Sequence, residues 1–350
     1  LFITIGAIFG KMMLKTNFYY INASRITQQK DHSKVLNLSI IGLLIIFPFY
    51  IQKITELSAL SGIDEFWKGL RFQTSSGSAD EAGLGVFSYF GAFANFSALI
   101  ACNESLNKRY RARNAIVLIV LVFVYGIIST ARTGVLTLLL GIISIFFVNK
   151  EASFARLLTG IIVFLLMFVL PAVFLEKGGS LDSSLVENMI SLLQNLQIYA
   201  LAGIVAFSEV TKNVALAPET SGIFAFFLNL LRAIGINVEV RSSVLDYIST
   251  PWPTNVYTIY FPYYVQFGYA GVAIIMTFIG IIVSIFYGLA MKGRPEFVVL
   301  NALATAFLMI SVFAESFFTA LSYWFQLLIF LFFFYRVIPS VHFGRQRARA

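Results

Sequence analysis

The chain has 350 residues, of which 59% are hydrophobic and only 12% are charged, and its mean hydropathy is +0.84. Soluble domains carry about 25% charged residues, so this composition excludes an ordinary soluble domain and indicates a polytopic membrane protein. Because the net charge of +8 follows the membrane topology described below, it does not indicate a nucleic-acid partner.

Apolar runs of the length that a membrane-spanning helix needs follow one another along the whole chain. They are at 1–10 (partial), 36–52, 84–103, 115–130, 133–149, 157–175, 268–290, 297–314 and 319–335. Two shorter runs, 196–208 and 222–234, suit re-entrant or interfacial helices or a further hairpin across the bilayer. We predict one all-α transmembrane bundle over residues 1–350, with about 9 to 11 spans. Since the chain begins at Leu1 rather than at methionine, we expect residues to precede it.

Basic residues gather on every second loop of this map, as they do on the cytoplasmic loops of membrane proteins. Seventeen of the 25 Lys and Arg, against four acids, give these loops a net charge of +13, whereas the rest of the chain has −5. The basic loops are 11–34, 104–114, 150–156, 291–296 and the C-terminal tail. This predicts a cytoplasmic C-terminus and two large loops, 53–83 and 176–267, on the outer face. Loops of such length are usually functional or disordered, and the aromatic content of the second argues against disorder.

Four arginines lie on the predicted outer face, where positive charge is otherwise avoided. They are Arg71, Arg132, Arg232 and Arg241. A guanidinium group binds phosphate or carboxylate with two parallel hydrogen bonds, so the set suits a ligand that carries a diphosphate at the membrane surface. The alternative for each is a snorkelling side chain or an ordinary ion pair with a nearby acid.

Arg132 is the strongest candidate of the four. Its loop, in "STARTG", is so short that the charge must lie at the ends of two helices, where ionisable groups are costly and usually mark a site. The helix that begins there directs its positive N-terminal dipole toward the same anion.

Phenols and amides are concentrated in "PWPTNVYTIYFPYYVQFGYAGV", residues 251–272, where two prolines prevent a regular helix. Such groups suit sugar rings, which present both C–H faces and hydroxyls. The candidate glycan-binding residues are Asn255, Tyr257, Thr258, Tyr263, Tyr264 and Gln266, with Tyr323 from the last outer turn. The alternative is the aromatic belt of membrane interfaces, which does not account for the amides and the threonine.

Glu315, in "FAESFFTALSYW" at 313–324, is the acid nearest to the hydrocarbon in a predicted span end. It suits a general base, and it equally suits an ion-pair partner of Arg132. The sequence has no metal-ligand spacing and no glycine-rich phosphate loop, so we expect neither a metal nor a nucleotide cofactor.

Three stretches resemble Wzy-type O-antigen polymerases, over roughly residues 65–335. These are the Arg-Thr-Gly at 132–134, the stretch "TNVYTIYFPYYVQFGYAGVAIIMTFIGIIVSIFYG" at 254–288, and the arginine-bearing outer loop before residue 84. Asn-Val-Tyr-Thr followed by Phe-Gly-Tyr-Ala-Gly is the most specific part. Family members often carry Asp before the Phe-Gly pair, where this chain has Gln266.

The resemblance implies a metal-independent glycosyltransferase of the bacterial inner membrane, active on the periplasmic face. It would transfer a growing glycan from undecaprenyl diphosphate to the non-reducing end of a lipid-linked repeat unit, with Arg132 and Glu315 as catalytic residues. The expected partners are the lipid-linked donor and acceptor, the bilayer and a chain-length regulator. The alternatives are an O-antigen ligase, whose pattern includes a periplasmic histidine, and a polysaccharide flippase or other transporter.

Overall fold

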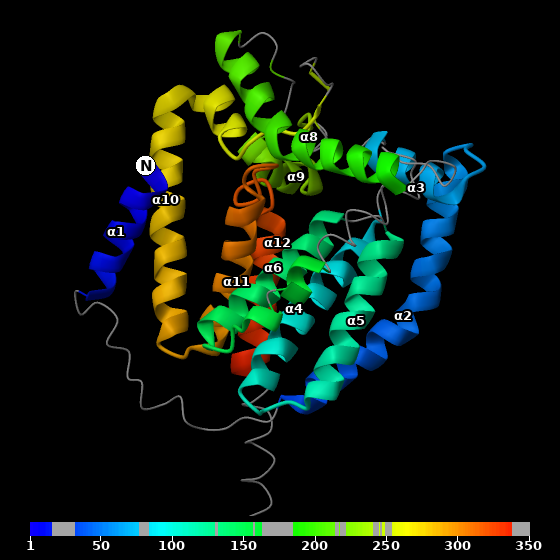
Figure 1. Cartoon of the computed structure of the whole chain (residues 1–350), viewed down its shortest axis with the longest axis vertical. Coiled ribbons are helices and arrows are strands. Elements are labelled where there is room, and N and C mark those ends of the chain that lie inside the picture. Colours follow the sequence, from blue (N-terminus) through cyan, green and yellow to red (C-terminus); the bar gives the residue numbers. More distant parts are fainter. Residues whose placement is uncertain are drawn as a thin grey trace, which may run out of the picture.

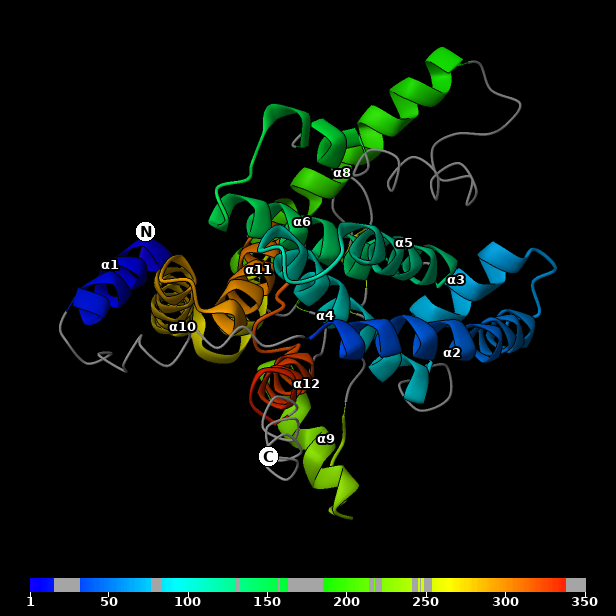
Figure 2. The same ribbon diagram turned by 90° about the horizontal axis from the view of Figure 1, so that it is seen from below.

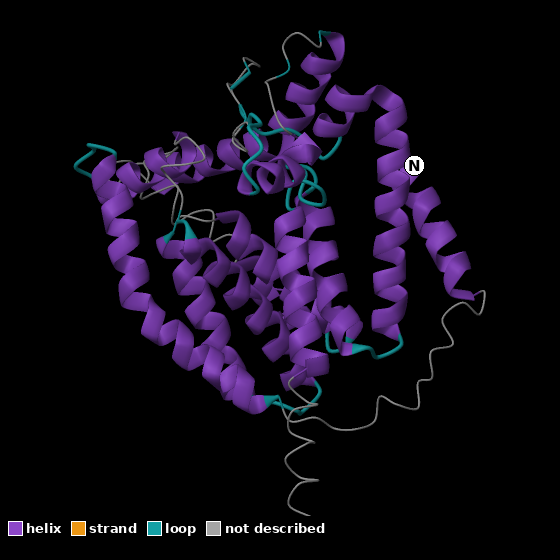
Figure 3. Ribbon diagram, turned by 180° about the vertical axis from the view of Figure 1, so that it is seen from behind, coloured by secondary structure: helices purple, strands orange, loops and turns teal. Residues whose placement is uncertain are grey.

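The computed structural model describes residues 1–15, 32–76, 84–129, 132–156, 158–162, 185–213, 222–240 and 254–337, with Ala217, Leu245, Tyr247 and Ile248. Within these residues the chain is helical and forms no strand apart from one antiparallel bridge between Ile248 and Thr254 (Figure 3). The all-α class predicted from the sequence is therefore confirmed.

Three of the described helices are long and apolar enough to cross a membrane. They are α2 (Ser33–Leu60), α4 (Val86–Leu106) and α10 (Phe261–Met291). Shorter apolar helices accompany them: α1 (Phe2–Lys15), α5 (Ala112–Ile128), α6 (Arg132–Val148), α11 (Pro295–Ile310) and α12 (Leu321–Phe332), which continues as the π-helical turn η4 (Phe333–Val337). Of the predicted span 157–175 only 158–162 is described, so the number of spans stays a prediction.

The helices run between two ends of different character (Figure 1). Helices α3 (Phe66–Ser76), α8 (Leu185–Lys212) and α9 (Ala225–Ala233) lie at one end, beside the turn from α11 to α12. We call this the outer end. The turns from α4 to α5 and from α10 to α11 lie at the opposite, inner end. The described parts of the predicted outer loops and of the predicted basic loops are thus separated in space, and which end faces the cytoplasm stays a prediction.

Helix α11 is the centre of the bundle. Ten of its 16 residues are buried, and it packs against α6, α4 and α10. Small residues permit the close approach, since Gly141 of α6 faces Leu99 and Ala302. The outward faces of α2, α5, α10 and α12 carry exposed Leu, Ile, Val and Phe, as expected of helices surrounded by lipid.

The two predicted outer loops contain more helix than the hydropathy map indicates. In the loop predicted at 53–83, residues 53–60 continue α2 and 66–76 form α3. In the loop predicted at 176–267, the apolar run 196–208 is the second half of one 28-residue helix, α8, and 222–234 forms the short turn η3 (Gly222–Phe224) and α9. The runs 196–208 and 222–234 are predicted as helices by the sequence, whereas α3 and the first part of α8 are missed because amphipathic segments have low mean hydropathy.

Helix α10 begins at Phe261, seven residues before its predicted start, and it is interrupted at Gly268. That glycine has φ of +63° and ψ of −161°, a backbone conformation that glycine alone adopts without strain. The break separates an outer segment with Tyr263, Tyr264 and Gln266 from the long apolar part. The conspicuous Phe-Gly pair of the sequence therefore marks the joint between a candidate site and a membrane span.

Candidate functional site

The predicted site residues that the structure describes lie at the outer end of the bundle. They come from the first turn of α6, α9, the segment just before α10, the outer segment of α10, the turn between α11 and α12, and the first turn of α12. Helix α8 crosses above them (Figure 1). Segments that are far apart in the sequence thus form one region.

Glu315, in the turn between α11 and α12, is the best-defined polar group of this region. Its Oε1 accepts hydrogen bonds from the Tyr263 hydroxyl at 2.6 Å and from the backbone N–H groups of Phe317 and Phe318 at 2.6 and 2.8 Å. Its Oε2 accepts one from the N–H of Thr319 at 2.7 Å. Because Glu315 is only 9% exposed and Tyr263 is 0% exposed, these charge-assisted hydrogen bonds stabilise a buried negative charge.

This geometry fixes two elements relative to each other. The carboxylate closes the turn through three consecutive N–H groups and ties it to α10 through Tyr263. A carboxylate offers about four lone-pair sites, so acceptor capacity toward a substrate remains only on Oε2. The arrangement favours a positioning role for Glu315 over that of a general base.

The first turn of α6 begins at Arg132, four residues after α5 ends. The Arg132 side chain lies outside the described part of the structure, so its ion pair with Glu315 stays a prediction. Its surroundings are described. Gly134 faces the side-chain amide of Asn95 on α4, and Asn95 shares a side-chain hydrogen bond with Tyr323 on α12. Three helices therefore meet at polar groups beside the N-terminus of α6.

Asn95 escaped the sequence prediction, although its signal is visible. It lies in the run "FGAFANFSALIA", where an amide is expensive in lipid and marks an internal contact or a site.

Aromatic rings connect the Glu315 turn to the Arg132 end. Phe307 of α11 lies between Phe317 and Tyr323, with ring centroids 5.9 and 6.2 Å away. Tyr323 in turn contacts Phe96 of α4 edge-on at 4.6 Å. The turn that carries Glu315 and the helix neighbours of α6 thus share one packed layer.

The candidate glycan-binding residues fall into two groups. Tyr257 stacks on Phe261 at 4.2 Å and is buried, as is Tyr263, so these two rings present no open face to a sugar. Asn255, Tyr264, Gln266 and Tyr323 are half-buried at the same end. Tyr264 lies edge-on to both Phe207 of α8 and Tyr269, and the Gln266 amide packs against Gly222.

Thr258 is unusual because its buried Oγ1 has no hydrogen-bond partner among the described residues. Helix α8 covers it closely. A Cβ added to Gly203 of α8 would lie 2.8 Å from the carbonyl oxygen of Val312 and 3.5 Å from the backbone nitrogen of Thr258. Only glycine lets α8 approach the site this closely.

Of the four arginines, only Arg232 has a side chain within the described part of the structure. Arg232 is exposed in the last turn of α9, where a cation suits the helix C-terminus. Arg71 lies in α3, and its side chain, like the whole of Arg241, is outside the description. Their convergence on a diphosphate stays a prediction. No group of three His, Cys, Asp or Glu side chains placed to hold a metal occurs in the part of the chain that was described.

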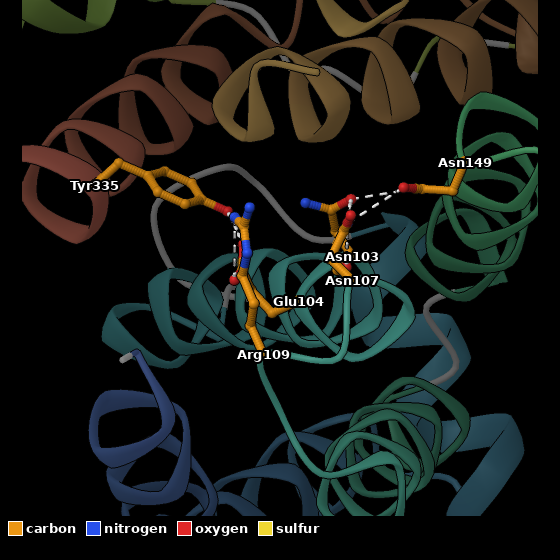
Figure 4. Close-up of polar contacts among 6 residues, drawn as sticks. All are labelled: Asn103, Glu104, Asn107, Arg109, Asn149 and Tyr335. Carbon is orange, nitrogen blue, oxygen red and sulfur yellow. Dashed lines mark hydrogen bonds and ion pairs between the residues drawn. The ribbon is translucent and has the colours of Figure 1, made fainter. Parts of the chain in front are cut away.

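A second buried polar cluster lies at the inner end (Figure 4). Glu104 of α4, 1% exposed, accepts a hydrogen bond from the Tyr335 hydroxyl at 3.2 Å, and its Oε2 lies 3.9 Å from Nη1 of Arg109. Side-chain amides meet beside it, those of Asn103, Asn107 and Asn149. These contacts join α4, α6 and η4, so the cluster holds the inner end together and lies away from the candidate site.

Comparison with known proteins supports the resemblance seen in the motifs. The chain is 27% identical over 181 residues to a protein named O-antigen polymerase from Shigella dysenteriae. The match covers 51% of this chain and 44% of the relative, so the chain spans less than half the length of that relative. No family model and no solved structure matches the chain.

Proposed function

We propose that this helical membrane protein is a polymerase of lipid-linked oligosaccharide repeat units. It transfers the growing glycan from undecaprenyl diphosphate to the non-reducing end of a second lipid-linked repeat unit, at the periplasmic face of the bacterial inner membrane, with its C-terminus in the cytoplasm. The similarity to an O-antigen polymerase supports an enzyme of the glycosyltransferase type.

The observation that carries the proposal is the assembly of polar groups at the outer end. The α6 N-terminus with Arg132 lies beside the Asn95–Tyr323 pair, and Tyr323 belongs to the same packed layer as the Glu315 turn. A lipid-linked diphosphate lies at this depth of the membrane. Its headgroup therefore meets an anion site made of a guanidinium and a helix N-terminus.

The chemistry needs little beyond charge stabilisation and orientation. The acceptor hydroxyl attacks the anomeric carbon of the donor glycan, and the bond from that carbon to the diphosphate oxygen breaks. Arg132 and the α6 dipole stabilise the charge that develops on the leaving diphosphate. The hydroxyl proton is released to water at the outer face, and no metal is required. Glu315 acts first by positioning the turn, although its Oε2 keeps acceptor capacity for a proton.

Further residues are assigned to binding. Arg71, Arg232 and Arg241 contribute to the diphosphates of donor and acceptor. Asn255, Tyr264, Gln266 and Tyr323 contact sugars, whereas Tyr257, Thr258 and Tyr263 shape the site from beneath. The loops of the outer face offer a surface to a chain-length regulator.

A ligase is less well supported. His32 lies at the inner end, where its ring stacks on Phe334 at 4.6 Å and meets Tyr335 edge-on. His342 is outside the described residues. The structure thus gives no described histidine at the outer end.

Loss of the gene distinguishes the candidate functions by the glycans that accumulate. A strain without a polymerase carries single repeat units on lipid A-core, and we expect this phenotype. Long chains that remain on the lipid carrier would identify a ligase. Repeat units trapped at the cytoplasmic face would identify a flippase.

A further inference from the structure

Helix α9 is amphipathic, and its apolar face is uncovered. Phe227 and Leu231 of α9 and its C-cap residue Ile234 follow one another at helical spacing on one side, and Asn229 and Arg232 lie on the opposite side. Phe227 is 51% exposed and Ile234 67% exposed, and no residue of α9 is buried. A contiguous exposed apolar face of this kind marks a contact with a partner or a membrane.

Two aromatic contacts fix where this face lies. Phe224, just before α9, contacts Phe267 of α10 with ring centroids 6.1 Å apart. Phe226 of α9 stacks on Phe325 of α12 at 5.1 Å. Helix α9 is thereby attached to the outer ends of two bundle helices. It runs across the bundle axis and projects beyond α12, as seen along the bundle in Figure 2.

The apolar face of α9 continues the lipid-facing surface of these two helices. Phe325 is itself 48% exposed, and exposed apolar side chains continue from it down the outer side of α12. They are Leu328, Ile329, Phe332 and Phe333. On α10 the contact residue Phe267 is exposed in the same way. The medium that surrounds the outward faces of α10 and α12 therefore also contacts the apolar face of α9.

We propose that α9 is an interfacial helix whose apolar face is immersed in the acyl chains of the outer leaflet. Its nine residues span about 14 Å, too short to cross the roughly 30 Å hydrocarbon core. Its orientation across the bundle axis is the one that an amphipathic helix adopts in the interface plane, with the polar side toward the headgroups. The occupant of this surface is the bilayer, and the inference does not depend on the enzyme activity.

Site-specific fluorescence tests this placement in the intact protein. In a Cys102→Ala background, single cysteines at Phe227→Cys and Ile234→Cys report the apolar face, and Asn229→Cys on the same helix is the matched control. Each is labelled with an environment-sensitive fluorophore and reconstituted in nanodiscs of phosphatidylethanolamine and phosphatidylglycerol. Each variant must elute as a single peak with the thermal stability of the parent. Because positions 227 and 234 both report the apolar face, the test can be made with one of them if the other variant fails this check.

We expect labels at 227 and 234 to emit at shorter wavelength, to be quenched by phospholipids with a nitroxide near the headgroup, and to be protected from iodide. The label at 229 should behave in the opposite way. Iodide quenching at 227 and 234 as strong as at 229 would place the face in water and overturn the proposal. Protection from both quenchers would show that protein, such as a second copy of the chain, covers the face, and would overturn it equally.

Discussion

Glu315 shows how the sequence can locate a residue without showing which groups it contacts. Its place at the end of a span was readable from hydropathy. Its partners were not, because one is a tyrosine 52 residues away and the others are backbone N–H groups of a turn. With these donors, the Glu315 carboxylate is expected to hold the turn in place rather than to act as a general base. The two roles can be distinguished by mutation.

The Glu315→Gln variant separates anchor from base. Gln keeps one carbonyl oxygen for Tyr263 but directs an NH2 group at an N–H of the turn, so we expect unfolding free energy to fall by about 1–3 kcal/mol. Polymer synthesis should persist at a reduced level. Thermal unfolding in detergent and the polymer ladder on a gel measure both effects, and Tyr263→Phe, which removes one donor, should be milder. A Glu315→Gln protein as stable as the parent that makes no polymer would assign Glu315 as the base.

Asn95 provides a second test at this scale. In Asn95→Leu the amide that contacts Tyr323 and faces Gly134 is lost, so the N-terminus of α6 is no longer held. We expect the polymerisation rate to fall about tenfold, equivalent to about 1.4 kcal/mol in activation free energy. The loss in the free energy of unfolding should be smaller than this. Tyr89→Phe, an exposed position on the same helix, is the control. A parent-level rate in Asn95→Leu would remove this residue from the site.

At the scale of elements, hydropathy located α2, α4, α5 and α6 to within a few residues, except that α2 extends eight residues further. Membrane spans can be located from local sequence, because a run of about twenty apolar residues can form few structures other than a membrane-spanning helix. The break in α10 and the course of α8 depend on contacts between distant segments. Gly268 permits the break through its positive φ, and Gly203 permits the close approach of α8, so each glycine gives a prediction.

Gly203→Val should push α8 away from the site. The added Cβ meets the backbone of Val312 and Thr258, which cannot move aside as a side chain can. Overpacking costs about 1–3 kcal/mol, more than a helix gains from losing a glycine, about 1 kcal/mol. Lower thermal stability and less polymer are expected. Ile204→Val, at an exposed neighbouring position, should leave both unchanged, and an unaffected Gly203→Val protein would show that α8 does not cover the site.

Gly268→Ala probes the joint in α10. No atom lies within 4 Å of the added Cβ, so the cost comes from the backbone conformation alone, about 1–3 kcal/mol. A straightened α10 would also draw Tyr263 away from Glu315 and lower activity. Gly42→Ala in α2, with the same open space and no positive φ, should be neutral or stabilising. Equal stability of the two variants, measured by thermal unfolding, would contradict the strained joint.

At the scale of the whole molecule, the separation of the two ends followed from charge and hydropathy, because positive charge on alternate loops reports which loops share a side. The lateral arrangement of the helices did not follow from them. Helix α1 packs only on α10 among the strong helix contacts, with Gly6 and Gly280 against the backbone of the partner helix. The sequence of an apolar helix in lipid does not indicate which helix it packs against, since small residues and shape complementarity determine the pairing.

The same limit applies to the candidate site. Arg132, Glu315 and the aromatic stretch were predicted as site residues because they are anomalies of composition near hydrocarbon, and their roles stay predictions. The sequence did not predict three features: the contact of Asn95 with Tyr323, the covering of Thr258 by α8, and the inner-end cluster around Glu104. Each is defined by residues that meet only after folding.

Chain elongation by the purified protein in nanodiscs tests the central claim most directly. The substrate is the undecaprenyl-diphosphate-linked repeat unit, without nucleotide sugar, and products are separated by length. We expect a ladder from the parent, none from Arg132→Ala, and a weak one from Arg132→Lys, since a point charge replaces only part of the guanidinium fork. Arg156→Ala, which removes an exposed arginine paired with Glu151, should match the parent. A full ladder from Arg132→Ala would contradict the account, as would a parent protein that folds but does not elongate the substrate.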